Sequence, residues 1–106
     1  ISVHVQRMDG RAMSELRDAA DVLKNKLKSG VVVLGGTDGE KALLVVSVSK
    51  DLTSRVQAGA LIKETAPIIG GGGGGRPDFA QAGGSRPGEL DRALEMVPGI
   101  LEKLVS

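Results

Sequence analysis

The chain has 106 residues, which suits one domain built around one hydrophobic core. It contains no Cys, Trp or Tyr and a single Phe, so disulfides and thiolate metal sites are excluded and the core must be aliphatic. The formal net charge is +1, so the bulk charge does not indicate a nucleic-acid partner, and any such prediction depends on where the charges lie.

The chain shows no sign of a membrane or secretory segment. No apolar run approaches the roughly 20 residues that a membrane-spanning helix needs, and no signal peptide is visible. The absence of Cys leaves the redox compartment open and favours a cytoplasmic location. The chain begins at Ile1 rather than Met, which indicates a fragment of a longer protein.

The first segment predicts a strand followed by a helix. Residues 2–6 alternate valine with polar residues, as in a half-buried strand. Asp9 is suited to cap a helix from about Gly10 to Lys28, and Gly30 stands where a left-handed residue often ends a helix. The apolar stripe of this helix is Met13, Leu16, Ala20, Leu23 and Leu27.

Two β-branched runs follow and predict a hairpin. Residues 31–34 are continuously apolar, as in a strand that is covered on both faces. Residues 35–40 contain an Asp-Gly pair typical of a turn, and residues 42–48 form the second run. We expect these two runs to pair as an antiparallel hairpin at the centre of the sheet.

The second half of the chain predicts two more helices. Asp51 or Thr53 is expected to open one, and Pro67 should end or kink it. Ser85 is expected to cap the last helix, whose stripe keeps its register across Pro98, so we expect a kink there rather than a break. That stripe is Leu90, Leu94, Val97, Leu101 and Leu104.

Together these elements predict an α/β fold with the order β-α-β-β-α-(β)-α, in which the bracketed strand falls within residues 78–84. The expected architecture is a small mixed β-sheet with helices packed on it. Residues 1–106 form a single domain, because apolar elements flank the glycine run that would otherwise resemble an interdomain linker.

Six consecutive glycines, Gly70 to Gly75, are the most unusual feature of the chain. They match a dinucleotide-binding G-x-G-x-x-G trivially, but they follow a predicted helix rather than a strand. A phosphate-binding P-loop needs Gly-Lys-Ser/Thr, whereas this run ends in Arg76 and Pro77. Two interpretations remain, a flexible linker and a loop whose bare N–H groups face a phosphate or carbonyl oxygen.

The sequence predicts no catalytic residues and no metal ligands. It has one His and no Cys, and the His is not spaced from acidic residues as in a catalytic triad or a metal site. His4 falls on the polar face of the first strand, where we expect a surface residue.

Several residues beside the glycines are candidate ligand contacts, each with a structural alternative. Arg76 is either solvated or a phosphate contact, and Asp78 either binds a ligand donor or forms a turn. Gln81 is a candidate hydrogen-bonding residue, and Phe79 either joins the core or stacks on a base. A basic set forms either a solvated surface or a nucleic-acid patch: Lys24, Lys26, Lys28, Lys50, Arg55 and Lys63.

Residues 72–84, GGGGRPDFAQAGG, resemble the C-terminal signature of bacterial-type alanyl-tRNA synthetases. Residues 46–59 and residues 21–27 with the run that follows them are similar to the same domain, so the resemblance covers essentially the whole chain. The wider superfamily is the nucleic-acid-binding domain attached to DHH phosphoesterases. Members of that branch often carry a His directly after the glycines, where this chain has Arg76 and Pro77.

The resemblance implies a C-terminal tRNA-binding domain of a larger synthetase. Such a domain contacts the elbow of tRNA(Ala), where the D and T loops meet, and supports aminoacylation and editing by the full enzyme. The parent implied is an ATP-dependent alanine–tRNA ligase of the cytoplasm. ATP and zinc are expected in its other domains, and this fragment is expected to be non-catalytic and to hold no cofactor.

The residues expected to contact RNA are Gly71, Gly72, Gly73, Gly74, Gly75, Arg76, Asp78, Gln81, Lys50 and Arg55. Two alternatives from other classes remain open. One is an accessory nucleic-acid-binding domain of a DHH-type phosphoesterase. The other is a protein-interaction module with a flexible glycine loop.

Overall fold

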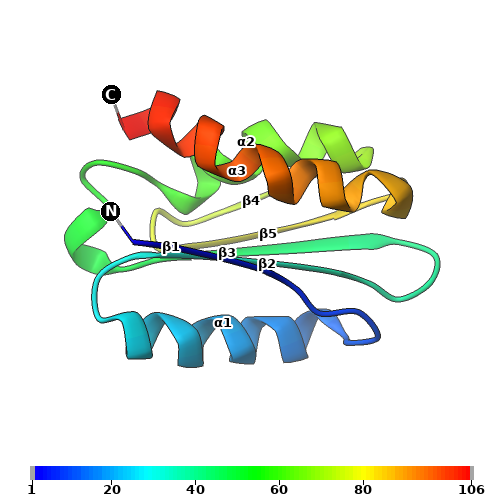
Figure 1. Cartoon of the computed structure of the whole chain (residues 1–106), viewed down its shortest axis with the longest axis horizontal. Helices are drawn as coiled ribbons and strands as arrows, with labels where there is room; N and C mark the ends of the chain where they lie inside the picture. Colours follow the sequence, from blue (N-terminus) through cyan, green and yellow to red (C-terminus); the bar gives the residue numbers. More distant parts are fainter. Residues whose placement is uncertain (1, 106) are drawn as a thin grey trace.

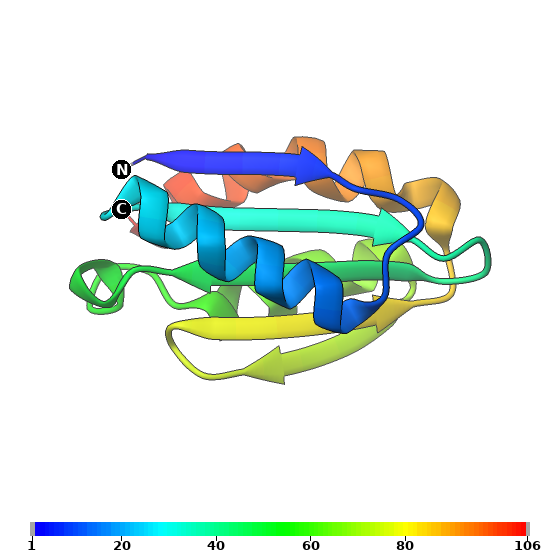
Figure 2. The same cartoon turned by 90° about the horizontal axis from the view of Figure 1, so that it is seen from below.

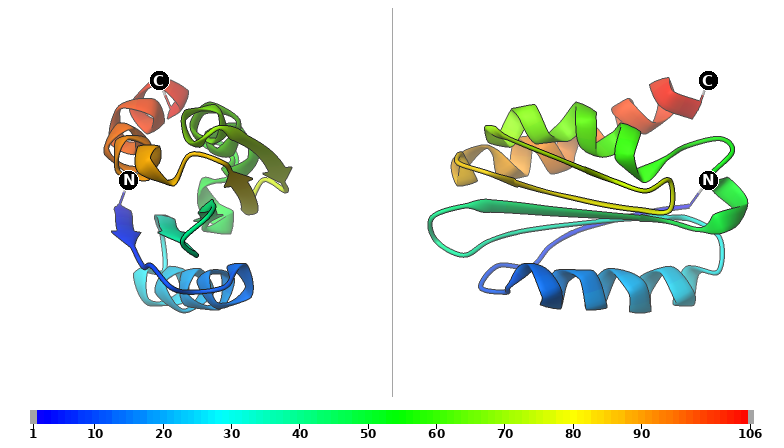
Figure 3. Two further views of the ribbon diagram at one scale, coloured as in Figure 1. Left: turned by 90° about the vertical axis from the view of Figure 1, so that its right-hand side faces the viewer. Right: turned by 180° about the vertical axis from the view of Figure 1, so that it is seen from behind.

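The computed structural model describes residues 2–105 as three layers, with α1 on one face of a sheet and α2 and α3 on the other (Figure 1). The strands are β1 Val3–Arg7, β2 Val31–Thr37, β3 Ala42–Val48, β4 Gly71–Gly75 and β5 Phe79–Gly84. The helices are α1 Met13–Leu27, α2 Ala58–Thr65 and α3 Leu90–Val105, with short 3₁₀ turns η1 Lys50–Leu52, η2 Ala66–Ile69 and η3 Pro87–Glu89. Figure 3 shows the same layering from the side and from behind.

The sheet has the strand order β1-β2-β3-β5-β4 (Figure 2). The β1–β2 pair is parallel, and every other neighbouring pair is antiparallel. The predicted mixed sheet and the predicted β2–β3 hairpin are confirmed, with β3 at the centre. β1 and β4 are the two edge strands, and they differ greatly in the side chains that they present.

The core follows from the two apolar runs at the middle of the sheet. Val31 and Val33 are buried against the α2–α3 layer, whereas Val32 and Leu34 are buried against α1. A strand with helices on both faces reads as a continuous apolar run, as predicted. The predicted stripes of α1 and α3 lie on the sheet side of their helices, and α3 continues through Pro98 as one helix.

The helix caps differ from the sequence prediction. α1 begins at Met13 after Ala12, not at Gly10 after Asp9. The Asp9 carboxylate instead accepts hydrogen bonds from the Thr37 N–H at 3.2 Å and from Arg7 at 2.8 Å, so it ties β1 to the end of β2. The hydrogen bond from Arg7 holds the pKa of Asp9 below its usual range.

The second and last helices also begin later than predicted. Residues 50–52 form a 3₁₀ turn, and α2 starts at Ala58 rather than at Asp51 or Thr53. The Thr53 hydroxyl does not cap a helix but donates back to the Lys50 carbonyl. The α-helix ends at Thr65 and continues as a 3₁₀ turn containing Pro67, as its missing N–H leads one to expect. Ser85 donates its hydroxyl to the Gly70 carbonyl instead of capping α3.

The end of α1 carries a strained residue at an unexpected position. Lys28, not Gly30, has the positive φ, 64°, with ψ at −49°. The Ser29 N–H donates to the Leu27 carbonyl at 2.6 Å, which closes a γ-turn of the rare, strained hand around Lys28. Gly30 is required for a different reason, since a Cβ there would lie 2.8 Å from the Ser2 carbonyl oxygen.

We predict that Lys28→Gly raises the free energy of unfolding by about 1 kcal/mol, because glycine adopts this backbone conformation without the penalty that a side chain imposes. Lys26→Gly, inside the last turn of the same helix, is the control and should lower it by about 0.5–1 kcal/mol. Urea unfolding of both variants measures the difference. An equal loss of stability in the two variants would show that Lys28 is not strained.

Candidate nucleic-acid interface

The glycine run is a β-strand, so the prediction of a loop or linker is wrong. Gly71–Gly75 pairs antiparallel with β5 along its whole length, and Gly70 precedes it in the left-handed conformation with φ 72°. A tight turn joins the two strands, closed by the Arg76 N–H donating to the Phe79 carbonyl at 2.7 Å. The ladder of hydrogen bonds and the packing of α2 on β4 offset the entropy that five glycines lose on ordering.

The glycines of β4 fall into two alternating sets. Gly73 pairs with Ala82, and both residues face the α2–α3 side of the sheet. A Cβ at Gly73 would lie 2.7 Å from the Ala82 Cα and would overlap the Gln81 carbonyl oxygen. The same kind of backbone overlap would occur at Gly71 and Gly75. The fold therefore requires glycine at these three positions, because the β4 and β5 main chains are in contact there.

Gly72 and Gly74 belong to the other set and face the α1 side of the sheet. A Cβ at either position would have no atom within 4 Å. Both glycines are exposed, and glycine in a strand is less stable than alanine by roughly 0.5–1 kcal/mol. Neither a lack of space for a side chain nor a gain in the stability of the fold explains why these two positions are glycine. Their bare backbone therefore points to a contact with a molecule outside the domain.

These two glycines lie on an open part of the sheet, which we call the glycine shelf: Gly72, Gly74, Gln81 and Gly83. The register places all four on the α1 face, since Gln81 pairs with both Gly74 and Val45, and Val45 is buried beneath α1. α1 packs on β2 and β3 and leaves β4 uncovered (Figure 2). Gly72, Gly74 and Gly83 are exposed and Gln81 is half-buried.

Phe79 and α1 border the shelf. Phe79 is partly buried and packs against the buried cluster under α1, and the Arg17 guanidinium lies over its ring, 5.2 Å from the centroid. One part of the Phe79 ring therefore packs in the core, and another part contacts the Arg17 guanidinium. The polar pocket beside it is lined by Arg17, Asp18, Asp21, Lys24, Ser47, Arg76, Asp78 and Phe79.

Arg76 stands in the turn at one end of the shelf. Its side chain is 75% exposed, and its Nε lies 3.6 Å from Asp78 Oδ1. An exposed pair of this kind contributes little to stability, so the guanidinium is available to a phosphate. Asp78 positions the turn through its main chain, because its carbonyl accepts the Val48 N–H at 2.9 Å.

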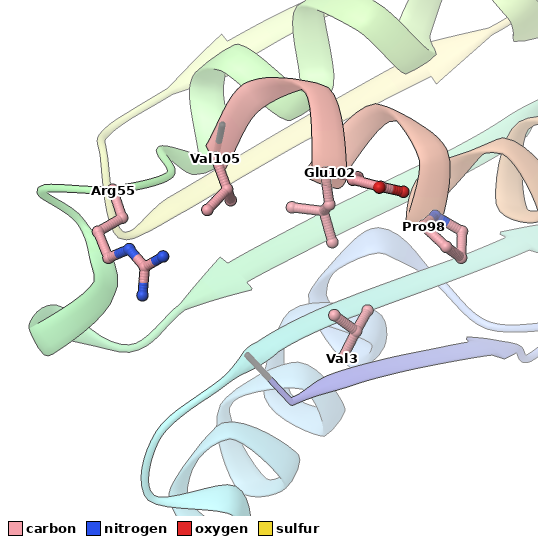
Figure 4. Close-up of a pocket in the computed structure, with 6 residues that line it drawn as sticks. Val3, Arg55, Pro98, Glu102 and Val105 are labelled. Carbon is pink, nitrogen blue, oxygen red and sulfur yellow. The ribbon is translucent and has the colours of Figure 1, made fainter.

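The two remaining candidates lie apart from the shelf. Lys50 opens η1 and lines a pocket with Lys24, which also lines the pocket beside Phe79. Arg55 lines a different pocket on the α3 side, where Figure 4 shows it with Val105 and Val3. The structure therefore gathers the β4–β5 candidates in one place and sets Arg55 elsewhere.

Sequence reasoning missed two residues of this region. Arg17 reaches Phe79 from α1, and nothing in the spacing of the two residues predicts this contact. Gly83 joins the shelf through its register with Gly72. The sequence predicted a strand within residues 78–84, but its pairing with the glycine run, which brings Gly83 beside Gly72, was not predicted.

Within residues 2–105 there is no group of three or more His, Asp and Glu side chains that would hold a metal ion. His4 lies on β1, with its Nε2 2.8 Å from Gln6 Oε1. None of the helices in the described range is both long and apolar enough to cross a membrane.

The chain belongs to the DHHA1 domain family, whose sequence profile matches residues 1–103. It is 50% identical over 105 residues to an alanine–tRNA ligase of Shewanella amazonensis, covering 98% of this chain and 12% of that protein. It is 54% identical over 88 residues to the alanine–tRNA ligase of Desulfosudis oleivorans, covering 83% of this chain and 10% of that protein.

Among solved structures, the chain is similar to the C-Ala domain of Aquifex aeolicus alanyl-tRNA synthetase. The two are 34% identical with a TM-score of 0.84, and the match covers 98% of this chain and 90% of that one. The resemblance to the C-terminal domain of alanyl-tRNA synthetases is thereby confirmed. The chain spans about a tenth of the length of the two ligases, which are much longer proteins.

The two sets of glycines give a paired prediction. Gly74→Ala should leave the free energy of unfolding unchanged or raise it by up to about 1 kcal/mol, since the position is open. Gly73→Ala should lower it by about 1–3 kcal/mol or more, because the added methyl group overlaps the β5 backbone. Thermal unfolding followed by circular dichroism compares the two. Equal stability of the two variants would refute the alternation.

Proposed function

We propose that this domain binds tRNA as part of an alanyl-tRNA synthetase, with the glycine shelf as its contact surface. The observation that supports this proposal most directly is that Gly72 and Gly74 have no side chains although the fold has room for them. The similarity to alanine–tRNA ligases supports the choice of tRNA(Ala) as the ligand. The tRNA elbow, a structured corner that exposes bases, is the part of the tRNA that we propose meets the shelf.

A side-chain-free stretch of sheet suits this partner physically. The peptide planes of β4 form a flat surface that a base pair or a ribose-phosphate segment can approach to van der Waals contact. RNA is recognised mainly through shape, stacking and contacts to sugar and phosphate, and any side chain at these positions would hold it away. Gln81 adds an amide donor and acceptor inside the shelf, and Arg76 adds a charge at its end.

The electrostatic part of the binding should be modest. The cations beside the shelf are matched by carboxylates, since three of each line the neighbouring pocket. We therefore expect log Kd to change with log salt with a slope of only a few units. We also expect weak discrimination between tRNAs, because the elbow is similar in most of them.

In the parent enzyme, this contact would hold the tRNA for both aminoacylation and the editing of mischarged tRNA(Ala). ATP and zinc would act in other domains of that protein, which we place in the cytoplasm. The domain itself would then contribute binding rather than chemistry.

We predict that Gly74→Val weakens binding to a tRNA(Ala) transcript at least several-fold without lowering the melting temperature of the domain, because the new side chain stands in the contact surface. Gly99→Val is the matched control. A Cβ at Gly99 would likewise have no atom within 4 Å, but this exposed glycine lies on α3, on the opposite side of the sheet. Fluorescence titration measures both.

Three results would contradict the proposal. One is the absence of tRNA binding by the folded domain at low salt. Another is an equal effect of the two valine substitutions. The third is a loss of binding in Gly74→Val that merely follows a loss of thermal stability.

Arg76→Ala should reduce the slope of log Kd against log salt by about one unit if Arg76 contacts a phosphate. Arg92→Ala is the control, since Arg92 is 67% exposed and lies 3.5 Å from Glu89, much as Arg76 lies beside Asp78. Titrations at several salt concentrations give the slopes. An unchanged slope in Arg76→Ala would remove Arg76 from the interface.

A further inference from the structure

A second cationic site lies at the end of α1. Three lysines from two elements line one pocket of about 270 Å³, together with Asn25 and Ser49. Lys24 and Lys28 come from the last turn and cap of α1, whereas Lys50 comes from the 3₁₀ turn after β3. We call Lys24, Lys28 and Lys50 the lysine pocket.

No carboxylate lines this pocket. One carboxylate pairs with a lysine of the pocket, since Asp21 Oδ1 lies 3.7 Å from the Lys24 ammonium. Asp51 is engaged by the Ser29 hydroxyl at 2.6 Å, and this bond with that from Ser49 holds the pKa of Asp51 below its usual range. The residues that line the pocket therefore carry three positive charges and no negative charge, and Asp21 and Asp51 on the same two elements offset part of that charge.

A purely structural role accounts for only part of this arrangement. Lysines near a helix C-terminus interact favourably with the partial negative charge of its carbonyl groups, which explains cations on α1. It does not explain Lys50, which approaches from a separate element. An anion bound in the pocket would be attracted by all three ammonium groups.

The strained backbone at Lys28 also supports a role in anion binding for this pocket. Lys28 is the only non-glycine residue with positive φ within residues 2–105, and it holds a strained γ-turn that glycine would adopt without strain. Strained backbone persists where the surrounding structure imposes it, and it is enriched at ligand-binding sites. The strain is understandable if the Lys28 ammonium must be presented at this place.

The lysine pocket is continuous with the surroundings of the glycine shelf. Lys24 lines both this pocket and the polar pocket that contains Phe79 and Arg76. A line of cations interspersed with Asp18, Asp21 and Asp78 therefore runs from the β4–β5 turn along α1 to Lys28 and Lys50. An RNA that covered the shelf would place its neighbouring backbone over this line.

We propose that the lysine pocket binds a phosphate group of the same RNA whose exposed surface meets the glycine shelf. This inference rests on the proposed tRNA-binding function and adds a second anchor to it. One contact determines where the RNA sits, and two contacts also determine how it is oriented. Ammonium groups on flexible stems suit a phosphate as point charges, whereas Arg76 offers a planar fork.

The test compares two double variants with the same loss of charge. Lys28→Gln with Lys50→Gln removes two cations of the pocket, and Lys41→Gln with Lys63→Gln removes two exposed cations outside it. Titration with the tRNA(Ala) transcript should show weaker binding and a salt slope smaller by about one unit for the pocket pair. The control pair should retain the wild-type slope.

Lys28→Gly sharpens the test, because it should stabilise the fold and yet weaken RNA binding, which a folding defect cannot do. An equal effect of the two double variants would show that only the net charge matters, and the proposal would be wrong. Wild-type affinity in the pocket pair would refute it as well, even with Gly74→Val still defective. A wild-type domain that binds no tRNA would defeat the proposed function and this inference together.

Free phosphate is the other source of the same chemistry. Inorganic phosphate added at constant ionic strength should displace little tRNA from the wild-type domain, because a single phosphate contact is weak without the shelf. Displacement at low millimolar phosphate that disappears in the pocket pair would assign the pocket to small anions and overturn its assignment to RNA.

Discussion

The contact between the main chains of β4 and β5 is the constraint on which the rest of the structure depends. At Gly71, Gly73 and Gly75 even a methyl group would overlap the neighbouring strand. This close approach makes a regular strand of a segment that has no side chains to hold it. It also places the turn with Arg76 and Asp78 at one end of the sheet, where the Ala58 N–H donates to the Pro77 carbonyl at 2.8 Å and joins α2 to that turn.

The two faces of β4 then acquire different roles. On the α2–α3 side, the glycines pair with Ala80 and Ala82, which are buried and small enough for the helices to pack closely. On the α1 side, the single helix crosses β2 and β3 and leaves the edge of the sheet bare (Figure 2). The fold therefore requires the glycines of β4 that face α2 and α3, but it does not require the exposed glycines of β4 that face α1.

Much of the fold could be predicted from the sequence because its helices and central strands have strong periodicity. The stripes of α1 and α3 and the runs of β2 and β3 predicted their faces and their pairing. The glycine run has no side chains, so it has no hydrophobic periodicity from which a strand could be predicted. The conformational freedom of glycine suggested a loop instead. Only the ladder to β5 and the packing of α2 make it a strand.

The smaller errors have local causes. Asp9 and Ser85 are good capping residues that bond instead to Thr37 and Gly70, which lie far away in sequence. Gly30 was the obvious residue for positive φ, yet Lys28 adopts it. Of the candidate site, the residues of the β4–β5 turn could be predicted because they are adjacent in sequence. Arg17 and Gly83 could not, because α1 and the sheet register bring them in.

The central claim is that RNA lies on the α1 side of β4, over the glycine shelf. Chemical-shift mapping of the ¹⁵N-labelled domain titrated with a tRNA(Ala) transcript tests it most directly. We expect the amides of Gly72, Gly74 and Gln81 to shift or broaden first, and those of Met96 and Gly99 on α3 to remain unchanged. Binding that perturbs α3 and leaves the shelf amides unchanged would contradict it.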